Sequence, residues 1–261
     1  MIQEKNSLLA RSKFLLPRLG VNIDHIATLR ELRGTPYPDL IDAAKIIESA
    51  GGHQITVHLR EDRRHIQDAD VVGLRKKSGL LLNLEMAVTP AMIKFANKIR
   101  PDSICLVPEK RKELTTEGGL DIVKIKKNLS NVISDLRRKK IKVSLFIEPE
   151  LKLMELSHAL GAHSVELHTG KYCNATQGFY GAKSAKIIQT EFKRISECAK
   201  RCHELGLHAH AGHGFDYQNV RKIVALELIE EFNIGHSIVC RAVRVGLDQA
   251  VREMLSAIQA P

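Results

Sequence analysis

The chain contains no tryptophan, few other aromatic residues and no long apolar run. Aromatic residues make up 4% of the 261 positions, too few for the platform on which single-stranded nucleic acid stacks. The longest apolar runs are far shorter than the roughly 20 residues that a membrane helix needs. The first 18 residues carry scattered charges and no apolar centre, so they do not resemble a secretory signal. We therefore expect no nucleic-acid or membrane partner.

Cysteine is also scarce. The five cysteines are odd in number and scattered, which argues against a disulfide framework. Cys198 and Cys202 lie four apart on a predicted helix, but no further ligands of suitable spacing complete a zinc site. A reducing cytoplasm is the simplest location for such a chain.

Positive charge, by contrast, is in excess. The formal net charge is +10, which suits nucleic acid or anionic small substrates. Much of the excess lies in 124–142, where helical periodicity indicates a solvated helix face. A basic nucleic-acid-binding protein stays open as the non-enzyme alternative, and salt-sensitive binding of generic DNA would favour it.

Polar residues recur at every second position inside stretches that otherwise have the character of apolar strands. Alternate side chains of a strand share one face, and burying polar groups is costly unless they are paired or used. Several strands with this pattern predict one shared polar centre. The polar residues are Asn22 and Asp24; Thr56, His58 and Arg60; Asn83 and Glu85; and Glu166 and His168.

A strand followed by a helical pattern recurs eight times. This alternation favours a (β/α)₈ TIM barrel of the α/β class, with additional short helices, over a doubly wound sheet. No Gly-x-Gly-x-x-Gly follows the first strand, which counts against a dinucleotide fold. We expect one catalytic domain over 19–261 and a poorly ordered N-terminal extension over 1–18. The predicted strands are 19–24, 54–59, 80–86, 103–107, 143–147, 164–168, 207–211 and 230–234; the predicted helices are 38–50, 68–78, 90–98, 121–138, 150–160, 181–205, 217–226 and 241–258.

Polar groups follow nearly every predicted strand, whereas the opposite strand ends lack comparable clusters. Their concentration at one end predicts an active site at the C-terminal face of the barrel. Glycine-rich turns at 212–214 and 235–237 follow the seventh and eighth strands and suit a phosphate. Arg60 and His65, with Arg33 and Thr115 within reach, suit a second one. Two phosphate sites fit the condensation of two phosphorylated molecules.

Proton transfer is the chemistry that the strand ends favour. A carboxylate such as Glu85 at the mouth of an apolar barrel has a raised pKa, and His58 titrates near neutrality. Together they could perform repeated acid–base steps. The rival interpretation is a metal bound by His208, His210 and His213, but no matching carboxylates accompany them and His208 is expected deep in its strand. We expect no metal.

The chain resembles the pyridoxine 5′-phosphate synthase family from about residue 19 to the C-terminus. The resemblance rests on ordered segments that together are very specific: 20–30 (GVNIDHIATLR), 55–66 (ITVHLREDRRHI), 83–88 (NLEMAV), 106–111 (LVPEKR), 115–121 (TTEGGLD), 143–147 (VSLFI), 211–214 (AGHG) and 233–236 (NIGH). It implies the same barrel and the condensation of 1-deoxy-D-xylulose 5-phosphate with 3-amino-2-oxopropyl phosphate. The products would be pyridoxine 5′-phosphate, phosphate and water.

The resemblance also implies residue roles. His58 and Glu85 would be proton acceptors and His213 a proton donor. Glu166 would assist proton transfer or position an intermediate. Contacts to the amino-ketone phosphate would come from Asn22, Arg33, Gly214, Gly235 and His236, and contacts to deoxyxylulose phosphate from Asp24, His25, Arg60, His65 and Thr115. The family needs no cofactor and forms homo-oligomers, such as an octamer, through barrel-side helices.

Two further expectations concern the surroundings of the site. The loop after the fourth strand, with Gly118 and Gly119, is the candidate lid. His210 stands where the family commonly has asparagine, and we expect it to adjoin the site and tune His213. The enzyme alternative is another phosphosugar barrel, an aldolase or epimerase; an aldolase would want a buried Schiff-base lysine at a strand end. The one candidate is Lys142, which opens the fifth strand at the wrong end.

Overall fold

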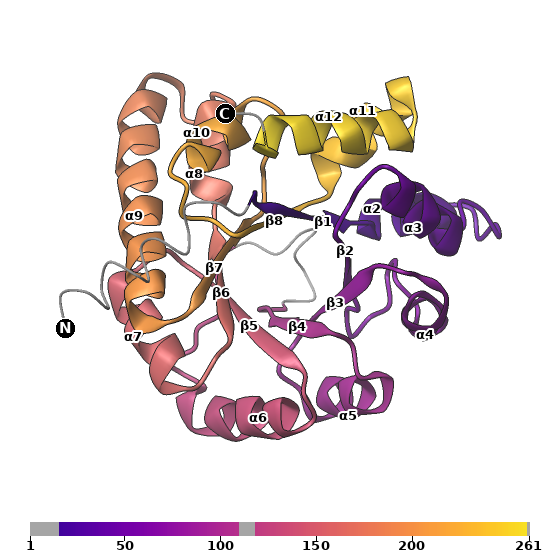
Figure 1. Cartoon of the computed structure of the whole chain (residues 1–261), viewed down its shortest axis with the longest axis horizontal. Helices are drawn as coiled ribbons and strands as arrows, with labels where there is room; N and C mark the ends of the chain where they lie inside the picture. The colour runs from indigo at the N-terminus through magenta and orange to yellow at the C-terminus, as the bar shows by residue number, and fades with distance from the viewer. Residues whose placement is uncertain (1–15, 110–117, 260–261) are drawn as a thin grey trace.

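The computed structural model describes residues 16–109 and 118–259, which form a closed barrel of parallel strands. The strands follow one another around the barrel in sequence order, and β8 pairs back onto β1 (Figure 1). The predicted TIM barrel is confirmed. The strands are β1 (Arg18–Asn22), β2 (Gln54–His58), β3 (Leu81–Met86), β4 (Ser103–Leu106), β5 (Lys142–Ile147), β6 (Ser164–His168), β7 (His208–Gly212) and β8 (Glu231–Ile234).

Helices surround the strands on the outside of the barrel (Figure 1). Local sequence signals set several of their ends. Pro90 opens α5 behind the Thr89 cap, a position where its missing N–H is harmless, and Gly206 ends α9 in the left-handed conformation. The helices are α2 (Asp24–Glu31), α3 (Leu40–Ser49), α4 (Asp68–Lys77), α5 (Pro90–Ile99), α6 (Lys126–Arg138), α7 (Leu151–Ala159), α8 (Gly170–Thr176), α9 (Ser184–Leu205), α10 (Asn219–Val224), α11 (His236–Val245) and α12 (Leu247–Gln259), with a 3₁₀ turn at Gly181–Lys183.

The helices differ from the prediction in two respects. The single helix expected over 241–258 is wrong, because Gly246 with φ +82° separates α11 from α12. Two further short helices, α2 and α8, begin at or just after the ends of β1 and β6. Their sequences carry polar and small residues in place of a long apolar stripe, which hid their periodicity.

The hydrophobic core lies between the strands and the helices, while the inside of the barrel is polar. Outward-facing strand residues such as Val21, Val57 and Leu84 are fully buried in the main apolar cluster. The inward face carries a hydrogen-bonded network instead, so the predicted alternation is confirmed. The network joins Gln54 to Glu231 at 2.9 Å, Thr56 to Asn233 at 3.0 Å, Ser103 to Asn83 at 3.1 Å and Asn233 to Glu166 at 2.8 Å.

The described part of the N-terminal segment joins the barrel directly. Most of the predicted extension, residues 1–15, lies outside the described residues. Arg18 is the first residue of β1 and pairs with Glu231 at 2.8 Å, so the barrel begins one residue before the predicted boundary. Within the described ranges no helix combines the length and the apolar character that crossing a bilayer requires.

Candidate active site

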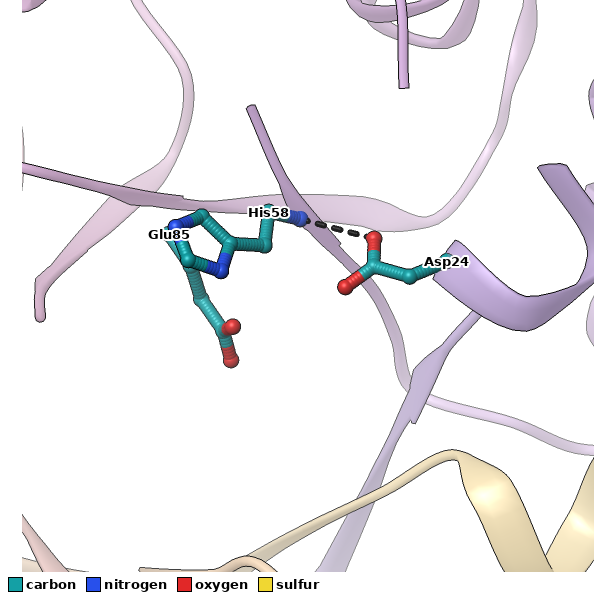
Figure 2. A group of neighbouring side chains, drawn as sticks. All are labelled: Asp24, His58 and Glu85. Atoms are coloured by element: carbon teal, nitrogen blue, oxygen red, sulfur yellow. Dashed lines mark hydrogen bonds between the residues drawn. The ribbon is translucent and has the colours of Figure 1, made fainter. Parts of the chain in front are cut away.

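Three proton-exchanging side chains meet at the C-terminal ends of the first three strands. Asp24 opens α2 directly beyond β1, His58 ends β2, and Glu85 lies beside His58 in the register of β3. The backbone N–H of His58 donates to Asp24 Oδ1 at 2.8 Å, as Figure 2 shows. One ligand atom of each residue lies within 4.8 Å of the others. The structure therefore brings together three of the predicted site residues.

Burial shifts the pKa of all three groups. It raises the pKa of Asp24 to about 7, and it raises the pKa of Glu85 well above its ordinary value, helped by the nearby charges of Glu166 and Asp24. Burial, with His65 and Arg60 acting in the same direction, lowers the pKa of His58 to about 3. At neutral pH the imidazole of His58 is thus uncharged, and Glu85 is the carboxyl best able to hold a proton.

Glu109 is a further carboxyl at this centre, which the predicted site residues did not include. Its Oε2 lies 3.9 Å from Nε2 of His58, and both atoms are buried and make no hydrogen bond to a described residue. Burial raises the pKa of Glu109. Glu109 follows the fourth strand within the LVPEKR segment, and this position could have identified it as a site residue. Nε2 of His58 therefore stays open to a substrate.

The ends of β1 and β8 form a second cluster of predicted residues. Asn22 exchanges hydrogen bonds with Asp24, accepting from its N–H at 3.0 Å and donating to its carboxylate at 2.9 Å. Gly235 precedes α11 so closely against Asn22 that a Cβ there would lie 2.7 Å from the Asn22 carbonyl oxygen. The rings of His25 and His236 meet edge to face at 5.0 Å. Both strand ends thus face one space.

The loop after β2 is tied to α2. His65 lies 6.4 Å from His58 between ring centroids, and burial lowers its pKa to about 4. Arg60 is buried, at 2% exposure. Arg30 holds the loop by two contacts of 2.7 Å to Asp70 and one of 3.2 Å to the His65 carbonyl. Arg30 is therefore a positioning residue that the list of predicted site residues did not contain.

His213 lies across the barrel mouth, after β7. Its backbone has φ +76°, in the left-handed region that non-glycine residues rarely adopt. The hydroxyl of Thr169 lies 2.7 Å from the Gly212 carbonyl and 2.8 Å from the His213 carbonyl, which holds this turn to the start of α8. Gly214 follows with φ +91°. Burial lowers the pKa of His213 to about 4.

Glu166 lies deeper than predicted. It occupies the middle of β6, accepts from Asn233 at 2.8 Å and has 3% exposure. Burial and the neighbouring Glu231 raise its pKa to about 8. Glu166 also adds to the raised pKa of Glu85, and its expected part in proton transfer or positioning stays a prediction.

The N-terminal end of the barrel is also polar, contrary to the prediction. A cavity of about 360 Å³ opens there, lined by Glu166, His210, Glu231 and several basic side chains. His210 lines this cavity with its Nδ1 3.4 Å from Glu231, so the expectation that it adjoins the site is wrong, and its effect on His213 stays a prediction. The inward alternation of β6, β7 and β8 continues down to this end, and polar residues there pair with one another.

Several predicted residues lie apart from the centre. Arg33 is exposed on the turn after α2 and makes no hydrogen bond to a described residue of the cluster. Thr115 lies outside the described residues, as does most of the predicted lid. Gly119 donates to Glu148 at 3.0 Å. The roles of Arg33, Thr115 and the lid stay predictions.

The histidines of β7 do not form the metal site weighed above. His208 is exposed at the start of the strand and pairs with Glu230 at 2.7 Å, so its expected deep position is wrong. Asp24, His58 and Glu85 are close enough to approach one cation. However, both Asp24 oxygens already accept hydrogen bonds, and burial raises the pKa of Glu85 and so disfavours the charged carboxylate that a cation prefers. This set favours proton exchange.

Comparison with known proteins agrees with this geometry. A family model described as "Pyridoxal phosphate biosynthesis protein PdxJ" matches residues 19–260. The chain belongs to this family. Relatives named pyridoxine 5′-phosphate synthase are 50% identical in Syntrophotalea carbinolica, over 90% of this chain and 96% of theirs, and 50% identical in Coxiella burnetii, over 92% and 98%. The predicted family is confirmed, and this member is an enzyme of vitamin B6 biosynthesis.

Solved structures of other barrel enzymes have a similar fold. A 4-hydroxy-2-oxoglutarate aldolase has a TM-score of 0.60 at 16% identity and covers 97% of each chain. Phosphoribosylanthranilate isomerase from Thermotoga maritima has a TM-score of 0.56 at 8% identity, over 94% of this chain and 100% of that one. At such identities the likeness concerns the fold alone.

Proposed function

We propose that this family member condenses 1-deoxy-D-xylulose 5-phosphate with 3-amino-2-oxopropyl phosphate to pyridoxine 5′-phosphate, phosphate and water. The observation that carries the proposal is the convergence of Asp24, His58 and Glu85 within 4.8 Å. Joining an amine to a ketone, losing phosphate and water and closing an aromatic ring need repeated proton transfers at one place. Relatives at 50% identity bear the synthase name.

His58 and Glu85 are the proposed proton acceptors, in complementary states. His58 is neutral at pH 7 because its pKa is about 3, and its Nε2 is open to a substrate proton. Burial raises the pKa of Glu85 and favours its protonated form, so it can deliver a proton first and take another back later. Such exchange suits a sequence in which carbonyl addition, dehydration and deprotonation alternate.

His213 is the proposed proton donor on the opposite side of the mouth. Its pKa of about 4 belongs to the buried imidazole without a neighbouring ligand. A phosphorylated substrate brings a dianion near the ring and raises this pKa, which favours the protonated form that a donor needs. Departure of phosphate or water would use that proton.

The two phosphate sites would adjoin each other. The amino-ketone phosphate would lie at Gly235 and His236, where the first N–H groups of the ten-residue α11 are unpaired by the helix, with Asn22, Arg33 and Gly214 around it. Deoxyxylulose phosphate would lie at Asp24, His25, Arg60, His65 and Thr115. The edge-to-face contact of His25 with His236 at 5.0 Å supports this adjacency, because condensation requires the two reacting carbons to meet.

The decisive experiment mixes the purified protein with both substrates, without added metal or nucleotide. Pyridoxine 5′-phosphate and released phosphate are measured together, and equal amounts of both are expected. Absence of both products from a folded protein that still binds phosphate would redirect the function to another phosphosugar conversion. An aldolase is disfavoured, since no lysine is among the buried side chains of the described ranges; borohydride should trap no adduct with the protein.

We further infer a homo-oligomer that acts in the cytoplasm without a cofactor. Leu32, just after α2, and Val243, on α11, are 73% and 79% exposed. The two helices are in contact, and exposed apolar side chains on adjoining elements favour an interface. The cysteines of the described residues are all free thiols, as in a reducing compartment. Light scattering should give a multiple of the chain mass, and L32E combined with V243E should lower it.

A further inference from the structure

A carboxylate–imidazole pair, Glu148 and His168, lies beside the proposed proton donor His213. Glu148 follows β5 and His168 ends β6, and Glu148 Oε1 lies 2.7 Å from Nδ1 of His168. The ring of His168 lies 5.0 Å from that of His213 at 56°. Phe146 packs edge-on against His168 at 5.1 Å and also lies 6.4 Å from the His213 ring. Three consecutive strand ends thus supply one row of interacting groups.

The chemistry of Glu148 decides which nitrogen of His168 carries the proton. Hydrogen bonding from His168 lowers the pKa of Glu148, and the N–H of Gly119 donates to the same carboxylate at 3.0 Å. An ionised Glu148 only accepts, so Nδ1 of His168 must donate to it. The other ring nitrogen of His168, Nε2, is buried and makes no hydrogen bond to a described residue.

Gly170 explains how close the two imidazoles can come. A Cβ at this position would lie 2.7 Å from Nε2 of His168 and 2.9 Å from Cδ2 of His213. Both rings therefore pack against one Cα, and Nε2 of His168 faces the side on which His213 lies. Any larger residue would push the rings apart, since real Cβ atoms do not approach other atoms this closely.

We propose that Glu148 and His168 are positioning residues that hold the His213 imidazole and keep a proton on it for transfer to the substrate. The inference rests on the proposed function, in which His213 is the donor. The negative charge of Glu148 favours the imidazolium form of His213, against the opposing effects of burial and of His168. Among the described residues, the charged and titratable groups facing the row are Glu148, His168, His213 and Arg194.

Substitution of Glu148 separates charge from shape. E148Q keeps an oxygen that accepts from Nδ1 but removes the charge, so we expect kcat to fall about tenfold with KM for both substrates changed less than about twofold. A donor must be protonated, so activity falls as pH rises through its pKa. E148Q should therefore move the alkaline limb of the kcat profile to lower pH by about one unit. E148D restores the charge and should recover much of the rate.

The chain offers a matched control at the other end of the barrel. His208 Nδ1 and Glu230 Oε2 form the same kind of pair at the same 2.7 Å, at the start of β7 and far from the mouth. E230Q removes an equivalent charge and hydrogen bond, so it reports the structural effect of such a change. Its turnover and pH profile should match those of the wild type.

NMR titration of the His213 ring tests the inference without relying on turnover. The His213 pKa should be lower in E148Q than in the wild type and unchanged in E230Q. If the wild type makes no pyridoxine 5′-phosphate, the proposed function fails while this titration still reports on the pair. An unchanged His213 titration in E148Q would overturn the inference, as would a rate loss in E148Q with an unmoved pH profile.

Discussion

Replacing Thr169 with valine removes the hydroxyl that holds the proposed donor in its unusual backbone conformation. Thr169 is 1% exposed, and its single proton is shared between the carbonyls of Gly212 and His213, at 2.7 and 2.8 Å. Valine has nearly the same shape, so the change isolates the hydrogen bond. The Gly212 carbonyl keeps the Thr169 N–H at 3.1 Å, so the change removes a hydrogen bond mainly from the His213 carbonyl and should cost about 1 kcal/mol of unfolding free energy.

The effect on catalysis should exceed the effect on stability. A non-glycine residue in the left-handed region is disfavoured by about 1–2 kcal/mol, so His213 at φ +76° will relax when Thr169 no longer holds it. A displacement of about 1 Å can lower a rate by about a hundredfold. We expect T169V to lower kcat by about ten- to a hundredfold, with a lower urea midpoint and an unchanged slope.

Serine at the same position is the matched control. T169S keeps the hydroxyl and loses one methyl group, which costs about 1 kcal/mol. Its stability should fall slightly while its turnover stays near that of the wild type. Equal turnover in T169V and T169S would refute the reasoning, because the hydroxyl would then have no part in positioning His213.

Three further predictions follow from the site geometry. E85Q should abolish turnover. Glu85 has a raised pKa in the folded state, so the wild type loses stability as pH rises and this buried carboxyl must give up its proton. The E85Q protein lacks this loss, so its urea stability should match that of the wild type near pH 4 and exceed it above neutral pH. G235A would place a Cβ 2.7 Å from the Asn22 carbonyl and should lose about 1–3 kcal/mol with a raised KM, whereas G73A in α4, where the nearest atom is 3.4 Å away, should be at least as stable as the wild type by urea unfolding. Dialysis against EDTA should leave turnover unchanged; a loss restored by a divalent cation would assign that cation to Asp24, His58 and Glu85.

Much of the fold was predictable because the barrel alternates two periodicities. Outward strand residues such as Val57 and Leu84 are apolar while inward Thr56 and Asn83 are polar, so period-two alternation revealed both the strands and the polar interior. The site was predictable as far as its residues lie at strand ends or just beyond them, as Asp24, His58 and Glu85 do. Helix α2 was not predicted from the sequence, because residues that serve the site stand where a helix would carry its apolar stripe.

Depth along the barrel was less predictable, because alternation marks the inward face and does not say which layer a residue occupies. Glu166 and His210 both point inward. The stagger of neighbouring strands places His210 beside Glu231 in the N-terminal cavity and Glu166 below Glu85. Contacts between residues distant in the chain were equally hidden: Glu109 reaches His58, and Glu148 reaches His168, only because parallel strands bring their ends together.

The sequence by itself determined the family, the barrel and the face that carries the site, since each follows from residue patterns local to one strand or one loop. Only the tertiary structure decided the protonation of the site and its supporting contacts. A pKa depends on burial and on neighbours supplied by other strands, as with Glu85 near Glu166 and Asp24. The position of His213 likewise depends on Thr169 and His168, which no local pattern connects to it.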